Sequence, residues 1–201
     1  MLKANFITAQ EAAEKIQDGS TLCTIGMTLV SASESILKAI EKRFETVGHP
    51  ADITLVHSCG QSDRKDGIQH LAHEGLVKRI VGSHWGLQPR WMEMIANSQV
   101  EAYCLPQGQI AQLYRSMACG LPGKMSKVGL GTFIDPRVEG GKMNDRTKPL
   151  PDLVDILEYG GEEYMFYKEI PLDTVLIRGT VCDEMGNLTT TEEAMKLEVL
   201  P

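Results

Sequence analysis

Apolar residues in the first half of the chain form short continuous runs, each followed by a segment in which they lie three or four positions apart. The four runs cover residues 20–25, 52–58, 78–82 and 100–105. Runs of this length suit buried strands, and the spacing after them suits amphipathic helices. This alternation predicts an α/β fold with a mostly parallel sheet, right-handed crossovers and helices on both faces.

The predicted helices share this three-and-four spacing and cover residues 9–17, 33–44, 68–76, 89–97 and 109–119. Thr8 is a good N-cap for the first of them, and Glu11 three residues later completes a capping box. In the last one, Ile110, Leu113 and Tyr114 lie on one face. Residues 59–67, between a strand and a helix, are polar and charged, and we expect an exposed loop there.

The pattern changes after Cys119, where extended runs replace helical spacing. Residues 127–131, 154–159 and 162–167 are such runs, and Gly160-Gly161 is a hairpin turn signal. We therefore expect an antiparallel hairpin excursion near residues 150–170. Residues 173–180 should then return as a central strand of the main sheet, before a turn leads into a final short strand near Leu188.

Composition narrows the class of protein. The chain has 201 residues and 42% hydrophobic content, enough for a sizeable core. A net charge of −7 argues against a nucleic-acid binder, which needs a basic face. No apolar run approaches the ~20 residues of a membrane span, so we expect no membrane partner. The five cysteines are scattered and odd in number, as in reduced cytoplasmic proteins, so a cytoplasmic location is expected.

The strand at residues 100–105 ends in a corner that carries an amide side chain. Pro106 stops the strand, Gln107 and Gly108 form the turn, and a helix follows. In open α/β sheets ligands bind outside the carboxyl ends of strands, so Gln107 is well placed for a substrate. The alternative is that Gln107 merely caps the helix.

Four motifs carry a resemblance to a known family. They are Pro106-Gln107-Gly108, Gly129-Leu130-Gly131-Thr132, Asp135-Pro136-Arg137 and Gly140-Gly141-Lys142-Met143-Asn144. In this order they resemble the N-terminal half of the glutamate-dependent, family I CoA-transferases of the single-chain acetate or propionate type. The resemblance runs from about Ala9 to Leu200. It implies that residues 1–201 are one N-terminal, α-subunit-like domain of the CoA-transferase fold.

The resemblance also implies a reaction. In the family a glutamate attacks an acyl-CoA thioester, forms an acyl anhydride and becomes a glutamyl-CoA thioester, which a short-chain carboxylate then resolves. Gln107, by resemblance, would donate its amide hydrogen bond to the oxyanion. Coenzyme A would be a substrate, and no permanently bound cofactor is expected.

The family's catalytic glutamate lies in a Glu-x-Gly-x-x-Gly setting that this chain lacks. Glu158 begins such a motif, but Glu163 stands where glycine is required, and Glu139 has glycine directly after it. We therefore expect the chain to end inside the fold near Glu198, without the catalytic half. A complementary C-terminal half or β-type subunit would supply that half, and the chain alone should have no turnover. The surface that this partner covers should be apolar, so a homo-oligomer is also expected.

Further candidates for substrate or CoA binding lie in two loops. Related enzymes have a glycine-rich turn after the first strand, and only Gly26 remains of it here, followed by Met27 and Thr28. Backbone N–H groups there could receive an anion, although an ordinary strand-to-helix turn is the alternative. The other candidates flank the motifs: Pro106, Gly108, Gly129, Gly131, Lys142 and Asn144. Lys142 could offer its charge to a substrate carboxylate or CoA phosphate, or its loop could be purely structural.

Three histidines invite a functional reading. His70 and His73 can share a helix face, but a catalytic zinc site needs a third protein ligand, and none is evident, so we expect no metal. His84 follows a strand and could line a pocket, although a hydrogen bond to the backbone is the commoner outcome for such a residue.

Two alternative functions remain open. One is a module without a nucleophile that binds CoA or an acyl group, or acts only in assembly. The other is a sugar-phosphate isomerase or deaminase of similar architecture, which the lack of an acid/base pair beside a phosphate loop weakens.

Overall fold

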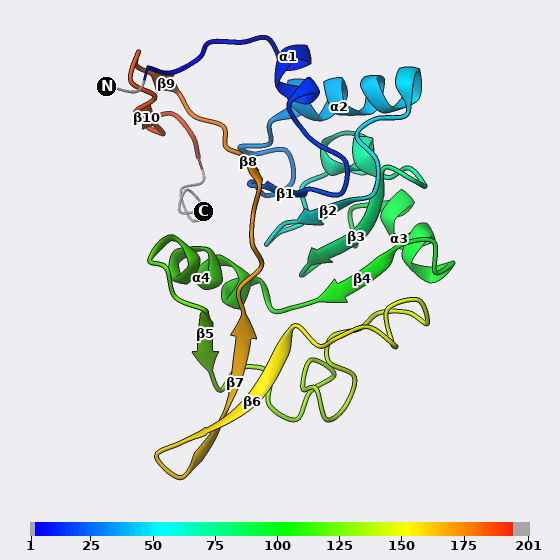
Figure 1. Ribbon diagram of the computed structural model, residues 1–201, viewed down its shortest axis with the longest axis vertical. Helices are drawn as coiled ribbons and strands as arrows, with labels where there is room; N and C mark the ends of the chain where they lie inside the picture. Colours follow the sequence, from blue (N-terminus) through cyan, green and yellow to red (C-terminus); the bar gives the residue numbers. More distant parts are fainter. Residues whose placement is uncertain (1–2, 195–201) are drawn as a thin grey trace.

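Five parallel strands form the main sheet of the computed structural model, which describes residues 3–194 (Figure 1). Their order across the sheet is β4-β3-β2-β1-β8. The bounds in that order are Glu101–Cys104, Val77–Gly82, Ile53–Val56, Thr21–Thr24 and Thr174–Leu176. Each neighbouring pair is parallel, so the predicted α/β class is confirmed.

One face of the sheet is covered by helices. They are α1 (Ala9–Glu14), α2 (Glu34–Val47), the 3₁₀ helix η1 (Gly67–Leu71) and α3 (Pro89–Ala96). Leu22, Leu55 and Ile80 belong to the cluster on this face, with Leu37 of α2 and Trp91 of α3. All five side chains are fully buried, so this layer forms the larger part of the core.

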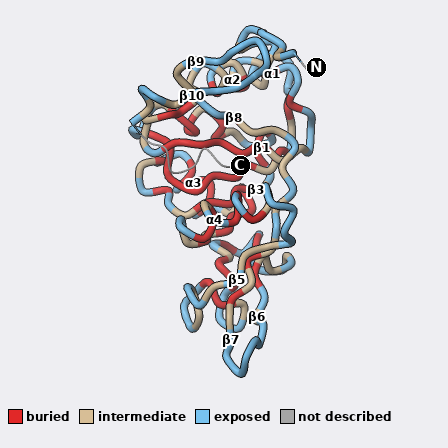
Figure 2. The backbone as a smooth tube through the Cα atoms, turned by 90° about the vertical axis from the view of Figure 1, so that its left-hand side faces the viewer, coloured by how far each residue is buried: buried red, intermediate tan, exposed pale blue. Residues whose placement is uncertain are grey.

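The opposite face packs on one helix and a second sheet. Helix α4 (Gln107–Ala118) contributes Ile110 and Tyr114, which cluster with Cys23, Val56 and Val81 of the main sheet. The second sheet is antiparallel and contains β5 (Gly123–Ser126), β7 (Glu162–Lys168) and β6 (Val154–Tyr159). Figure 2 shows its hairpin extending from the buried centre to an exposed tip. The predicted hairpin excursion is therefore confirmed.

The predicted ends of the elements hold only in part. Thr8 and Glu11 form the expected capping box, but α1 ends at Glu14 because Lys15 already takes the C-cap position. The helix expected at residues 68–76 is only the short η1. A final short hairpin, β9 (Val181–Cys182) and β10 (Leu188–Thr189), matches the strand expected near Leu188. The expected end of the chain near Glu198 lies outside the described residues.

Three predictions about the chain's path are wrong. The strand β8 lies at an edge of the sheet instead of its centre, because it pairs only with β1 among the described strands. Residues 127–131 form turns, and β5 precedes them at residues 123–126 because it pairs with β7. Residues 59–62 are buried, although the loop was expected to be exposed, because Gln61 donates through Nε2 to the Thr24 carbonyl at 2.7 Å.

The outer edge of β4 is covered by residues 141–147. The Cys104 N–H donates to the Gly141 carbonyl at 2.7 Å, and the Met143 N–H donates to the Ala102 carbonyl at 3.0 Å. The Ala102 N–H of β4 also donates to Oγ1 of Thr147, which belongs to this loop, at 2.7 Å. The loop therefore satisfies strand groups that would otherwise be available to another strand.

None of the helices within residues 3–194 has the length and apolarity that a membrane crossing requires.

Asn144 holds this edge loop in place, which leads to a stability prediction. Its Nδ2 donates to the carbonyls of Ile95 and Val100, both at 2.9 Å, and its Oδ1 accepts from Thr147 Oγ1 at 2.7 Å. Asn144→Ala should lower the free energy of unfolding by about 3 kcal/mol, because buried carbonyls lose their donors. Urea unfolding followed by circular dichroism measures the change.

The matched control for that experiment is Asp145→Ala. Asp145 is next to Asn144 in the chain, and its side chain is 84% exposed. It should change the free energy of unfolding by no more than about 0.5 kcal/mol. Equal effects of the two variants would show that the Asn144 hydrogen bonds do not stabilise the fold.

Candidate functional site

A cavity of about 550 Å³ lies at the carboxyl edge of the main sheet. It is built from the segments that follow β1, β2, β3 and β4, and from the loop after β5. Its lining residues are Met27, Thr28, Cys59, Gly60, Ser83, His84, Leu87, Cys104, Leu105, Pro106, Gln107, Phe133 and Ile134. In Figure 1, β2, β3 and β4 point toward the side on which α4 begins. Ligands of open α/β sheets bind at such an edge.

Gln107 is the first residue of α4 and lies at the cavity wall. Pro106 is the N-cap residue, and it provides no side-chain cap. The Gln107 amide is exposed and bonds to no residue within the described part of the chain. The alternative that Gln107 merely caps the helix is therefore not what the structure shows, and its amide is available to a ligand.

The loop after β1 reaches the same cavity through Met27 and Thr28. Met27 and Val30 pair across a tight turn, with N–H to carbonyl distances of 3.0 and 2.9 Å. Gly26 is required beneath it, because its φ is 139° and an added Cβ would lie 2.7 Å from the Val30 oxygen. Thr28 has a φ of 52°, which a non-glycine residue rarely adopts. Its N–H donates to the Gly60 carbonyl at 2.8 Å, which fixes the loop to the next segment.

The floor of the cavity rests on a buried histidine. His57 follows β2, is fully buried, and its Nδ1 bonds to the Cys59 carbonyl at 2.8 Å. Its Nε2 has no hydrogen-bond partner within residues 3–194. Only glycine fits at position 82, because an added Cβ would collide with the His57 ring. At Gly60 an added Cβ would lie 2.8 Å from His84 Nδ1, so the floor is made of main chain.

Cys104 lines the cavity without being a nucleophile. Burial raises the pKa of its thiol to about 11, so the thiolate is scarce at neutral pH. Its Sγ lies 3.4 Å from the Ser83 carbonyl, to which the thiol donates. Cys104 therefore acts as a small apolar wall residue in this structure.

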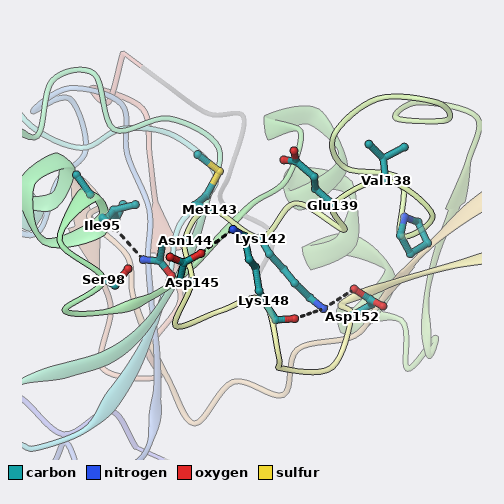
Figure 3. Close-up of a pocket in the computed structure, with 12 residues that line it drawn as sticks. Ile95, Ser98, Val138, Glu139, Lys142, Met143, Asn144, Asp145, Lys148 and Asp152 are labelled. Carbon is teal, nitrogen blue, oxygen red and sulfur yellow. Dashed lines mark hydrogen bonds and ion pairs between the residues drawn. The ribbon is translucent and has the colours of Figure 1, made fainter.

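A second cavity of about 590 Å³ lies by the loop that carries Lys142 and Asn144 (Figure 3). Lys142 Nζ is 2.9 Å from Asp152 Oδ1 and donates to the Lys148 carbonyl at 3.2 Å. Asn144 is bonded to main chain, as described above. Both side chains thus make structural contacts, and neither lines the cavity with Gln107.

The Gly129-Gly131 turn and Arg137 belong to a separate network. Asp135 is buried and accepts from the Gly131 N–H at 2.9 Å and from the Arg137 guanidinium at 2.8 Å. The hydrogen bond from Arg137 holds the pKa of Asp135 far below its usual range. Arg137 also pairs with Glu163 of β7 at 2.9 Å. This network fixes the turn to the second sheet, outside the cavity.

A comparison with protein families identifies the family of this chain. The model of the family described as Coenzyme A transferase matches residues 6–200. The chain belongs to the Coenzyme A transferase family. A caffeate CoA-transferase of Acetobacterium woodii is 44% identical over 191 residues, 94% of this chain and 36% of that protein. The acetate CoA-transferase YdiF of Escherichia coli K12 is 38% identical over 196 residues, 96% of this chain and 36% of its own length.

Two further comparisons place the chain within this family. The apoenzyme structure of the acyl-CoA transferase YdiF from Escherichia coli O157:H7 has a TM-score of 0.93 and 36% identity, over 98% of this chain and 38% of its own. The alpha subunit of an acetate CoA-transferase of Escherichia coli K12 is 25% identical, over 94% of this chain and 76% of that subunit. The chain thus corresponds to the α-like part of a CoA-transferase, and it spans about a third of the length of its most similar curated relatives.

Four of the candidate binding residues predicted from the sequence lie together at the cavity of this CoA-transferase chain. They are Met27, Thr28, Pro106 and Gln107. Gly26 and Gly108 adjoin it in sequence without lining it. Sequence reasoning missed eight lining residues, namely Cys59, Gly60, Ser83, Leu87, Cys104, Leu105, Phe133 and Ile134. A usable signal existed for Cys59, Gly60 and Ser83, because Ser83 directly follows β3 and the other two lie within four residues of the end of β2.

His70 and His73 have carboxylate neighbours that the sequence did not reveal. His70, Glu34 and Asp66 form one group whose geometry could hold a metal ion, and His73, Glu41 and Glu45 form another. In the first group, Lys38 Nζ already lies 3.0 Å from Glu34 and 3.3 Å from Asp66. Burial lowers the pKa of His70, but hydrogen bonds with Glu41 and Glu34 outweigh it and leave that pKa raised. The expectation of no metal site stays a prediction.

The buried imidazole of His57 makes stability depend on pH. Burial lowers the pKa of His57 to about 4, whereas an unfolded histidine has a pKa of about 6.5. Between these values only the unfolded state is protonated, so the contribution of His57 is complete above pH 6.5 and is lost as pH falls toward 4. His57→Asn should remove a slope of up to about 1.4 kcal/mol per pH unit.

The measurement is the difference in unfolding free energy between wild type and His57→Asn, taken by urea unfolding at several pH values from 4 to 8. The difference is used because the raised pKa of His70 acts with the opposite sign on the total curve. Gln112→Ala, at an exposed glutamine of α4, is the control and should leave the pH dependence unchanged. A difference that does not vary with pH would mean that folding does not shift the pKa of His57.

Proposed function

We propose that this chain is the N-terminal, α-type domain of an acyl-CoA:carboxylate CoA-transferase whose substrates include short-chain acids such as acetate and propionate. Three observations support this: its family, the cavity at the carboxyl edge of the sheet, and the exposed Gln107 amide, which bonds to no residue within residues 3–194. The overall exchange converts R–COO⁻ and R′–CO–S–CoA into R–CO–S–CoA and R′–COO⁻. One thioester is broken and one is formed, and no electron donor or acceptor is needed.

The proposed role of Gln107 is to donate a hydrogen bond to the oxyanion of each tetrahedral intermediate. Such a donor contributes about 3–4 kcal/mol to transition-state stability. A neutral amide suits this role, because a cation in its place would pair with an approaching carboxylate nucleophile. The exposed position of Gln107 at the start of a helix also adds the favourable field of the helix N-terminus.

The proposed nucleophile comes from a part of the enzyme outside residues 1–201. None of the lining residues of the cavity is Asp or Glu, as far as residues 3–194 are described. A complementary C-terminal segment or β-type subunit would bring the glutamate to the Gln107 wall. We also propose a cytoplasmic protein that forms a homo-oligomer, in keeping with its scattered cysteines and with exposed apolar side chains such as Phe133 and Val138.

A second candidate follows from the same lack of a carboxylate. Without a nucleophile the chain could bind CoA or an acyl group and react with neither. Isothermal titration of the chain alone with CoA tests the binding, and the exchange assay below separates the two functions.

Mixing the chain with its complementary part should restore CoA exchange between acetyl-CoA and propionate. Gln107→Ala should lower kcat/KM about 10² to 10³-fold, because one oxyanion donor is lost. The matched control is Gln112→Ala, an exposed glutamine on the same helix that lies outside the cavity. An unchanged rate for Gln107→Ala would remove Gln107 from the mechanism, and no exchange in wild type would favour the binding module.

A further inference from the structure

The walls of the cavity beside Gln107 carry no carboxylate, ammonium or guanidinium group among the described residues. Its polar side chains are Thr28, Ser83, His84 and Gln107, all able to donate a hydrogen bond without a fixed charge. A single carboxylate or thioester carbonyl can accept hydrogen bonds from these side chains. A second charge on the same substrate would find no charged partner among the described lining residues, and any part of it that leaves water would do so at a cost.

The remaining walls are apolar and come from separate segments. Leu105 and Ile134 are 1% and 7% exposed and form the buried part of the wall. Met27 and Phe133 are 37% and 41% exposed and leave large apolar surfaces facing the solvent. A ligand with an apolar body would remove that surface from water, at about 25 cal/mol for each Å².

The floor leaves room for such a body. Cys59, Gly60, Ser83 and Cys104 are all small, and Gly60 cannot carry a side chain without meeting His84. The cavity volume of about 550 Å³ lies within the range of pockets for drug-sized ligands. A two-carbon acid would leave most of it to water, each molecule taking ~30 Å³.

From this combination we infer that, while acetate and propionate are exchanged, the site prefers monocarboxylic acids with an apolar body of about five or more carbons, aliphatic or aromatic, to these short acids and to dicarboxylates. The inference rests on the proposed function, since it names the acid that the exchange consumes. The carboxyl group meets the polar wall with Gln107, and the apolar body lies between Phe133, Met27 and the small floor residues.

The test measures kcat/KM of the assembled transferase with acetyl-CoA as donor and a series of acceptor acids. The series is acetate, propionate, pentanoate, 3-phenylpropanoate and glutarate. Pentanoate should exceed acetate at least ~10-fold, because each buried CH₂ is worth about 0.8 kcal/mol, or roughly 4-fold. Glutarate has the length of pentanoate with a second carboxylate, and it should be at least ~100-fold poorer.

Two variants connect the preference to the cavity. Cys104→Leu fills the floor and should lower the pentanoate-to-acetate ratio about 10-fold, and Phe133→Ala should lower it several-fold through lost apolar contact. Val138→Ala, an exposed residue of the same loop that does not line this cavity, should leave the ratio unchanged. Thermal melting confirms that each variant is folded.

The outcomes separate the two proposals. Exchange that is fastest with acetate or propionate, or glutarate within tenfold of pentanoate, would overturn the substrate class and leave the transferase standing. A ratio insensitive to both Cys104→Leu and Phe133→Ala would likewise remove this cavity from acid selection. No exchange with any acid would overturn the proposed function and this inference together.

Discussion

The candidate site depends on the close packing of an imidazole against a bare glycine. His57 directly follows β2 and Gly82 ends the neighbouring strand β3, and only the missing side chain of Gly82 leaves room for the His57 ring. That ring holds the Cys59 carbonyl, and the next carbonyl, Gly60, accepts the N–H of Thr28. These contacts thus hold the segments after β1, β2 and β3 together at the floor of the cavity.

The molecule separates its charges from the cavity. The buried or half-buried ion pairs near the candidate loops, Asp135 with Arg137 and Lys142 with Asp152, lie in the scaffold and fix turns against sheets. The cavity itself offers neutral donors and apolar walls. In the mechanism proposed for Gln107, a hydrogen bond to a developing oxyanion would be stronger in such surroundings than in water, and an attacking carboxylate would meet no cation among the described lining residues. The same division explains why motif residues of the Gly140–Asn144 stretch, prominent in the sequence, make structural contacts.

The sequence predicts those features that local pattern controls. The capping box at Thr8, the hairpin at Gly160-Gly161 and the corner at Gln107 each follow from neighbouring residues. It does not predict the burial of Cys59–Ser62, since the partner of Gln61 is the carbonyl of Thr24, 37 positions away. It also does not place β8 at an edge, because an apolar run such as Val175-Leu176-Ile177 looks the same at either position. The lining residues that the sequence did not indicate come together through such long-range contacts.

The covering of β4 by residues 141–147 decides at which edge the main sheet can accept another strand. With Ala102 and Cys104 already bonded to that loop, no incoming segment can align beside β4 without first displacing it. At the far side, β8 has a neighbour on one flank only within residues 3–194. Within the described residues, an added strand from the same polypeptide or another could therefore widen the sheet beside β8 without displacing the loop that covers β4.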